Sequence, residues 1–308
     1  FKGTVGVTLD FKKDTADACP IFVARSIRGI KNGDSPEWLA ERLTAVGLRP
    51  ISALVDITNY FTFAYGRPLH VYDADKVQGT ITVRPAKEGE VLEALNDKTY
   101  TLQGGECVIA DDAGILGLGG IVGGIPSSVT EETKNIILEC AWFDPVAIAM
   151  TARAHQINTD AAYRFERTVD PAFVTIGIDM AAQMILALCG GVAMDSTHAG
   201  EPPIEEILID PPGPGEVLVR IQASGVCHTD LHYKLGAIND DFPFLLGHEG
   251  AGVVEEVGEG VVEPKTGDYV ILAWRAPCGN CRFCLVGKPH LCSSSLRRRP
   301  PPPDRPLL

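Results

Sequence analysis

The sequence contains no apolar run long enough to cross a membrane. The longest candidate, "IDMAAQMILALCGG", is interrupted by Asp179 and Gln183, so we expect it to form a buried helix. The chain also begins without a secretory signal, and its first residue is Phe, which is compatible with a fragment of a longer protein. These absences predict a cytoplasmic protein with no membrane partner.

Basic residues are scarce in this chain. Lys and Arg number 27 against 40 Asp and Glu, which gives a formal net charge of −13. Proteins that wrap a nucleic-acid backbone need dense positive charge. The balance therefore argues against DNA binding and restricts any RNA contact to a local site.

The composition is that of a globular protein, because 45% of the 308 residues are hydrophobic and 22% are charged. This length exceeds one typical core and predicts two domains. Of the nine cysteines, four are isolated in the first 200 residues, whereas five lie between Cys227 and Cys292. Such clustering in a chain without a secretory signal favours a metal site over disulfides.

Capping signals in the first 200 residues predict helices. In "NGDSPEWLAERLTAVGLRP", Ser35 is expected to cap a helix that begins at Pro36 and ends near Val46. Asp-Pro pairs at 144–145 and 170–171 predict two more helices, of which the second ends before Gly190. Short β-like runs lie between these signals: "TITVRPA", "ECVIADD", "ILGLGGIV" and "KNIILECAWF". The order predicts a mixed α+β fold.

The glycine-rich stretch "GLGGIVGG" does not fit a dinucleotide-binding fingerprint. Val122 stands where the third glycine is needed, and no helix signal follows. We interpret the stretch as a hairpin whose backbone packs closely against a neighbour.

Six motifs occur in a fixed order: "SPEWL", "VDITNY", "GRPLHVYD", "GLGGIVGG", "LECAWFDP" and "TDAAYRFERTVDP". Together they resemble the editing module of the bacterial phenylalanyl-tRNA synthetase beta subunit over about residues 1–200. Ala162 and Thr168 depart from the Ser and Gly usual in that family, and "GLGG" stands where "ALAG" is common. These departures affect the fine shape of the pocket rather than the fold.

The resemblance implies an RNA-binding enzyme of protein biosynthesis that hydrolyses tyrosine wrongly attached to tRNA(Phe). Its implied partners are the acceptor end of that tRNA and a synthetase alpha subunit. It implies that Glu139 binds the tyrosine hydroxyl and that Thr58, Asn59 and His70 line the ester and the terminal ribose. The pocket walls would be formed by Gly120, Gly123, Thr159 and Ala161.

Each of these residues also has an ordinary structural interpretation. A lone His70 is more often a satisfied core or surface histidine, and Glu139 at a strand end is usually a solvated carboxylate. The segment "YRFER" is interpreted as a salt-bridge cluster, in which Arg164 and Arg167 pair with Glu166 or Asp160.

Beyond residue 200 the pattern changes to period two. "GEVLVRIQA" predicts a half-buried strand, in which Val217, Val219 and Ile221 alternate with Leu218, Arg220 and Gln222. "GHEGAGVVEEVGEG" and "TGDYVILA" continue with strand, turn and strand. The segment is expected to be mainly β.

A C-x2-C-x2-C-x7-C pattern marks the end of this β segment. Four thiolates form a closed tetrahedral shell, which is typical of structural zinc. A disulfide pair and an iron–sulfur cluster are the alternatives for the same residues. The predicted ligands are Cys278, Cys281, Cys284 and Cys292.

"GVCHTDLHY", "LLGHEGAGVV" and the four-cysteine lobe resemble the GroES-like catalytic domain of medium-chain zinc alcohol dehydrogenases over about residues 203–292. The resemblance implies Cys227 and His248 as ligands of catalytic zinc, with Glu249 able to approach the metal. It also implies that Asp230 orients His248. The remaining implied roles are a proton relay through Thr229 and His232 and a cofactor contact by His228.

Two parts of that enzyme are not found in the sequence. The third ligand of catalytic zinc has no counterpart, and no strand-turn-helix unit carries G-x-G-x-x-G. We therefore expect one structural zinc, a weak or absent catalytic zinc, no NAD binding and no dehydrogenase activity.

The chain is thus interpreted as a fused or misassembled pair: an α+β editing module followed by a truncated, mainly β GroES-like zinc-binding domain. The predicted boundaries are 1–200 for the editing-like domain, 201–216 for a linker, 217–292 for the zinc domain and 293–308 for a disordered Ser/Arg/Pro tail. The alternatives are a zinc-dependent oxidoreductase fragment and a non-enzymatic binding protein stapled by zinc.

Overall fold

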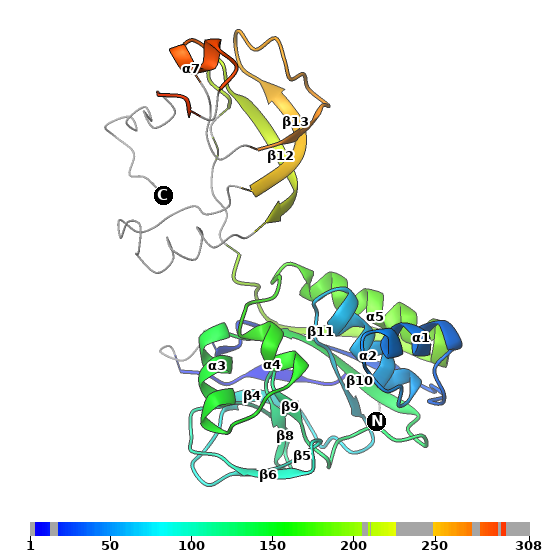
Figure 1. Ribbon diagram of the computed structural model, residues 1–308. Coiled ribbons are helices and arrows are strands. Elements are labelled where there is room, and N and C mark those ends of the chain that lie inside the picture. Colours follow the sequence, from blue (N-terminus) through cyan, green and yellow to red (C-terminus); the bar gives the residue numbers. More distant parts are fainter. Residues whose placement is uncertain are drawn as a thin grey trace. The chain divides into compact units, whose positions relative to one another are not determined.

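The computed structural model describes residues 4–12, 18–204, 209, 211–225, 249–272, 278–288 and 291–293. The chain divides into two compact units, Phe1–Glu205 and Glu206–Leu308 (Figure 1). In the described part of the chain, no helix is long and apolar enough to cross a membrane.

An antiparallel sheet lies at the centre of the first unit. The strands, in spatial order, are β11 (Val192–Gly200), β2 (Ile21–Arg28), β10 (Asn135–Trp142) and β3 (His70–Asp73). The long strand β10 pairs with β2 on one side and with the edge strand β3 on the other.

Helices cover one face of this sheet. α1, α2 and α5 lie on this side of the sheet (Figure 1). Their buried apolar residues belong to one core cluster with alternate positions of the strands, among them Val23, Leu138 and Val71. The period-two arrangement of strand side chains places these positions on one face. The helices are α1 (Glu37–Ala45), α2 (Ala53–Ala64) and α5 (Phe173–Cys189).

The intervening positions of the same strands face a second layer. Phe22, Tyr72 and Ile137 belong to a separate core cluster, which includes Val83 and Val108 of the second sheet. This sheet has the order β1 (Val7–Leu9), β4 (Ile81–Pro85), β7 (Cys107–Ala110), β8 (Ile115–Leu118) and β9 (Val122–Gly123). The hairpin β5 (Val91–Ala94) and β6 (Lys98–Thr101) and the helices α3 (Pro145–Ala154) and α4 (Asp160–Phe165) complete the layer.

The helix starts predicted from the sequence agree only partly with the helix starts in the structure. Asp144 caps α3 as expected, because its carboxylate accepts a hydrogen bond of 2.7 Å from the Ala147 amide. The prediction for Ser35 is wrong: Pro36 is the N-cap of α1, and the Ser35 hydroxyl instead donates to Asp56 at 2.6 Å. Asp170 accepts from the Ala172 amide at 2.9 Å, but α5 begins only after that residue.

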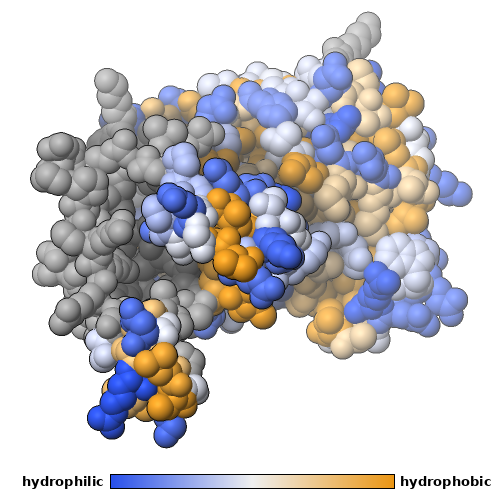
Figure 2. Space-filling model, turned by 90° about the horizontal axis from the view of Figure 1, so that it is seen from above, coloured by the Kyte–Doolittle hydropathy of each residue, from blue (hydrophilic) through white to orange (hydrophobic). Residues whose placement is uncertain are grey.

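The second unit contains an antiparallel sheet of β12 (Val217–Gly225), β13 (Glu249–Val257) and β14 (Tyr269–Ile271), followed by the short helix α7 (Arg282–Leu285). The predicted alternation in β12 is only partly right, because Ile221 is 48% exposed. The pairing register of β12 with β13 shifts between Leu218 and Val219 and again between Ile221 and Ala223, and such irregularities interrupt a regular alternation. Figure 2 shows hydrophobic and hydrophilic residues side by side on the face of the molecule that is seen from above. The α+β unit followed by a mainly β unit confirms the predicted fold class.

Candidate functional site

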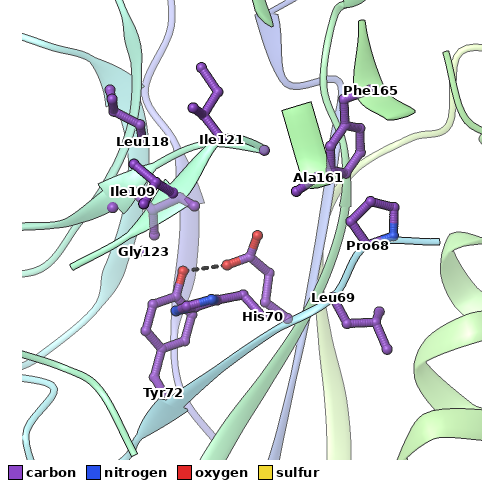
Figure 3. Close-up of a pocket in the computed structure, with 14 residues that line it drawn as sticks. Pro68, Leu69, His70, Tyr72, Ile109, Leu118, Ile121, Gly123, Ala161 and Phe165 are labelled. Atoms are coloured by element: carbon purple, nitrogen blue, oxygen red, sulfur yellow. Dashed lines mark hydrogen bonds between the residues drawn. The ribbon is translucent and has the colours of Figure 1, made fainter. Parts of the chain in front are cut away.

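A small pocket lies in the first unit, between the central sheet and the second layer (Figure 3). Its walls are mostly apolar, and the polar side chains that reach it are His70, Tyr72 and Glu139. The other lining residues are Pro68, Leu69, Ile109, Gly117, Leu118, Gly120, Ile121, Val122, Gly123, Ala161 and Phe165.

Strand pairing brings the three polar residues together. Glu139 of β10 lies directly opposite His70 of β3, so both side chains point from the same face of the sheet. Tyr72 is two residues beyond His70 and shares that face. The Tyr72 hydroxyl donates a hydrogen bond to Oε2 of Glu139, and the His70 ring lies edge-on to the Tyr72 ring with centroids 4.5 Å apart (Figure 3).

Burial controls the protonation of these groups. Glu139 is only 5% exposed, and burial raises the pKa of its carboxyl to about 7, although the hydrogen bond from Tyr72 opposes this shift. Burial lowers the pKa of His70 to about 4, so its imidazole is neutral near pH 7. Nε2 of His70 is buried and has no hydrogen-bond partner among the described residues. The pocket therefore contains a carboxyl with a pKa of about 7 and a neutral imidazole whose Nε2 has no hydrogen-bond partner among the described residues.

Two glycines make room for these side chains. A Cβ atom at Gly123 would overlap the His70 ring and lie 2.8 Å from its Nε2. Gly120 has φ +68°, and a Cβ there would lie 2.8 Å from Phe143 and 3.0 Å from Phe165. The β8–β9 hairpin that carries both residues fits the predicted close-packed hairpin.

Some other predicted site residues lie outside the pocket lining. Ala161 of α4 lines the pocket, whereas Thr159 caps α4 and its hydroxyl donates to the Ile121 carbonyl at 2.8 Å, next to the wall. Thr58 and Asn59 lie on α2, whose buried residues pack on the opposite face of the central sheet. The Thr58 hydroxyl donates within its own helix, to Val55 at 2.8 Å. Contact of these residues with a substrate stays a prediction.

Tyr72 was not among the residues predicted for the site. The signal that could have found it is the i, i+2 spacing from His70 in "HVYD", since alternate residues of a strand share a face. The apolar wall residues carried no separate signal, because short hydrophobic runs are equally typical of an ordinary core.

The segment "YRFER" forms the predicted ion pairs. Arg164 bonds Asp160 at 3.1 Å, and Arg167 pairs with Glu166. Arg164 also lies over the Phe63 ring, 4.4 Å from its centroid. These contacts stabilise the surface around α4 rather than forming part of the pocket.

The four clustered cysteines of the second unit converge. Their sulfur atoms lie within 4.8 Å of one another, and the sulfur of Cys281 is 3.5 Å from that of Cys284 and 3.9 Å from that of Cys292. A disulfide requires about 2.05 Å, whereas tetrahedral zinc with bonds of about 2.3 Å places its sulfur ligands about 3.8 Å apart. Backbone amides of Cys284 and Ser293 lower the pKa of Cys281 to about 5, whereas desolvation and the neighbouring Cys281 thiol raise the pKa of Cys284 to about 11. The donor set fits structural zinc.

The residues predicted for a catalytic zinc site lie mostly outside the described residues. The structure does not describe residues 226–248, and this range includes Cys227, Thr229, Asp230, His232 and His248. Glu249 is described and is an exposed residue at the start of β13.

The structure thus defines an α+β module with a buried carboxyl pocket, followed by a small β unit with a four-thiolate cluster. The chain belongs to the B3/4 domain family, whose model matches residues 18–190. Residues 213–299 match the alcohol dehydrogenase GroES-like domain. Both resemblances expected from the sequence are confirmed.

Relatives of the first unit are named as phenylalanine–tRNA ligase beta subunits. That of Paramagnetospirillum magneticum is 55% identical over 203 residues, which is 66% of this chain and 25% of the relative. That of Ruegeria pomeroyi is 53% identical over the same length and the same shares. The chain therefore spans about a quarter of the length of these relatives.

The second unit is similar in sequence to solved dehydrogenases. An alcohol dehydrogenase zinc-binding domain protein from Burkholderia ambifaria is 44% identical over 28% of this chain and 23% of that protein, with a TM-score of 0.27.

Proposed function

We propose that the first unit is an editing hydrolase that removes tyrosine from mischarged tRNA(Phe). The observation that carries this proposal is the buried Glu139 carboxyl in an otherwise apolar pocket, beside neutral His70. The names of the relatives, phenylalanine–tRNA ligase beta subunits, support the same class of substrate. The proposed partners are the acceptor end of the tRNA and a synthetase alpha subunit, in the cytoplasm.

The pocket chemistry suits a phenol. A site that binds phenylalanine cannot strongly reject an isostere with one more hydroxyl, so a second site is needed to remove tyrosine. A buried carboxyl that bonds this hydroxyl would be left without a partner when phenylalanine enters. Glu139 would therefore admit tyrosine and reject phenylalanine by about 10⁴-fold or more.

Hydrolysis would proceed by a positioned water. The lining contains no Ser, Thr, Cys or Lys side chain, and its His70, Tyr72 and Glu139 are assigned here to binding, so the proposal uses water as the nucleophile. We assign His70, whose Nε2 has no partner among the described residues, to the ester and the ribose end of the substrate. Positioning supplies most of the rate enhancement in such a site.

The pocket must widen to accept its substrate. Its volume is about 70 Å³, whereas a dry protein cavity that binds benzene measures about 150 Å³. Side chains of the wall therefore move when an aromatic ring enters, as is common at binding sites.

The test is the hydrolysis of tyrosyl-tRNA(Phe) by the full chain and by Glu139→Ala. We expect a large loss of hydrolysis with Glu139→Ala and a smaller loss with His70→Ala. The exposed carboxylate variant Glu132→Ala, on the surface of the same unit, is the control and should hydrolyse normally. Unchanged hydrolysis by Glu139→Ala, in a protein with the native circular dichroism spectrum, would remove Glu139 from the site.

For the second unit we propose one structural zinc held by the four clustered cysteines. Elemental analysis should find about one zinc per chain, and Cys281→Ser should release it under mild chelation. Two tightly held ions would point instead to the alternative of a zinc-dependent oxidoreductase fragment, which alcohol-dependent reduction of NAD would reveal. Absence of both activities would favour the third candidate, a non-enzymatic protein stapled by zinc.

A further inference from the structure

The Tyr72 side chain is buried, and its hydroxyl has a specific partner. Tyr72 is 1% exposed, and its hydroxyl donates to Oε2 of Glu139 (Figure 3). No other side-chain hydrogen bond of Glu139 occurs among the described residues. Each carboxylate oxygen can accept more than one hydrogen bond, but the bond from Tyr72 fixes the direction of Oε2, and Oε1 has no side-chain donor among the described residues.

Tyr72 keeps its proton under ordinary conditions. Burial and the neighbouring Glu139 raise the pKa of the phenol well above its usual value, so the hydroxyl remains a donor. A hydroxyl that donates to a carboxylate favours the ionised form of that carboxylate. The Tyr72 ring also packs edge-on against His70, with an interplanar angle of 70°.

We propose that Tyr72 is a positioning residue for specificity: its hydroxyl fixes the Glu139 carboxylate so that Oε1 alone accepts the phenol hydroxyl of the substrate. This inference rests on the proposed editing function. Without the Tyr72 hydroxyl, the carboxylate could rotate, could bind water with either oxygen and would be protonated more readily. Discrimination between tyrosine and phenylalanine would then weaken, although the ring would still fill the core.

The test variant is Tyr72→Phe in the full chain, which removes one oxygen and keeps the ring. Tyr100→Phe is the matched control, because Tyr100 is also buried in this unit and its hydroxyl bonds Asn96 at 2.8 Å, away from the pocket. We expect Tyr72→Phe to reduce the preference for tyrosyl-tRNA over phenylalanyl-tRNA by about tenfold, as the loss of a hydrogen bond to a charged group does. The control should keep the preference of the original protein.

The pH profile separates positioning from packing. The titratable groups around Glu139 are His70, whose pKa burial lowers to about 4, the Tyr72 phenol, and thiols of Cys19, Cys107 and Cys140, whose pKa values burial raises. A transition near pH 7 therefore belongs to Glu139. Because the Tyr72 bond lowers this pKa, Tyr72→Phe should move the transition to higher pH, whereas Tyr100→Phe should not.

The same shift can be measured without the reaction, from the ¹³C signal of the Glu139 carboxyl, assigned by its loss in Glu139→Gln. A higher midpoint in Tyr72→Phe, together with weaker discrimination, supports the inference. An unchanged midpoint overturns it, and so does unchanged discrimination. A parent protein that does not hydrolyse tyrosyl-tRNA overturns the proposed function, and the carboxyl titration then decides separately whether Tyr72 controls Glu139.

Discussion

The two units use cysteine in opposite ways. In the first unit, Cys19, Cys107, Cys140 and Cys189 are buried and unclustered, and burial raises the pKa of every one of these thiols. In the second unit, four cysteines converge, with their ligand atoms within 4.8 Å of one another. We therefore propose that cysteine acts as a small hydrophobe in the first unit and as a metal ligand in the second.

This difference reflects how each unit is stabilised. The first unit has two extensive apolar clusters, one on each face of its central sheet. In the described part of the second unit, the buried hydrophobic residues are only Val254 and Cys292, while Tyr269 and Ile271 are at least 80% exposed. We infer that packing stabilises the first unit, and we propose that a metal at the four cysteines contributes to the stability of the second.

Removal of zinc should cause the largest loss of stability, and this loss should be confined to the second unit. Structural zinc contributes about 10 kcal/mol or more to the folding of small domains. A strong chelator should therefore abolish amide hydrogen-exchange protection in β12, β13 and α7 and leave β10 and α5 protected. Loss of protection in β10 or α5 as well would show that the units are energetically coupled.

The next largest effect concerns the buried carboxyl of the first unit. The folded pKa of Glu139, about 7, exceeds the ordinary value of 4.5, so its contribution to stability is greatest below pH 4.5 and is lost as the pH rises to about 7. Glu139→Gln should consequently stabilise the first unit by about 3 kcal/mol at pH 8. Urea unfolding across pH 4 to 8 measures this, and an equal or lower stability of the variant at pH 8 would contradict the assignment.

The same urea unfolding experiment should also show how the protonation of His70 changes the free energy of unfolding. Its folded pKa is about 4 against an ordinary 6.5, so protonation of the unfolded chain destabilises the fold as the pH falls from 6.5 to 4. Between pH 4.5 and 6.5 this trend opposes that of Glu139. Glu139→Gln should therefore lose stability toward acid more steeply than the original protein.

A moderate effect is expected from added volume in the pocket. Gly123→Ala places a methyl group against His70, and overpacking of this kind costs about 1–3 kcal/mol. Gly33→Ala is the matched control, because its new Cβ would have no neighbour within 4 Å and its φ is not positive. Thermal unfolding should show a lower Tm for Gly123→Ala than for the control, and equal values would contradict the close packing.

The smallest effect should come from the surface of the same unit. Arg167 and Glu166 form an ion pair in which the Arg167 side chain is 53% exposed. Exposed pairs contribute at most about 1 kcal/mol and often nothing. Glu166→Gln should change the free energy of unfolding by less than about 0.5 kcal/mol, and a larger loss would show that polar contacts stabilise this unit as well as packing does.

Features with a local cause were predictable from the sequence. The Asp144 cap and the α5 termination at Gly190, which has φ +69°, follow from side-chain bonding and backbone conformation within a few residues. The four-cysteine spacing likewise predicted the sulfur cluster. The predicted N-cap of α1, Ser35, is wrong by one residue, because the Ser35 hydroxyl donates its hydrogen bond to Asp56, which is 21 residues away.

The pocket itself depends on contacts between distant segments. Glu139 and Tyr72 are 67 residues apart, and only the pairing of β10 with β3 brings them together. Family motifs identified Glu139, His70, Ala161, Gly120 and Gly123, all of which line the pocket. They did not identify Tyr72, because periodicity cannot tell a tyrosine that bonds a carboxylate from one that only fills a core.

The most direct test of this two-unit account is the rate of tyrosyl-tRNA(Phe) hydrolysis by the full chain before and after zinc is removed. We assign the reaction to Glu139 in the first unit and the metal to the second unit. The zinc-free protein should therefore hydrolyse at an unchanged rate, and Glu139→Ala should hydrolyse at a strongly reduced rate with or without zinc. Hydrolysis that disappears with the zinc and returns when the zinc is restored would contradict it.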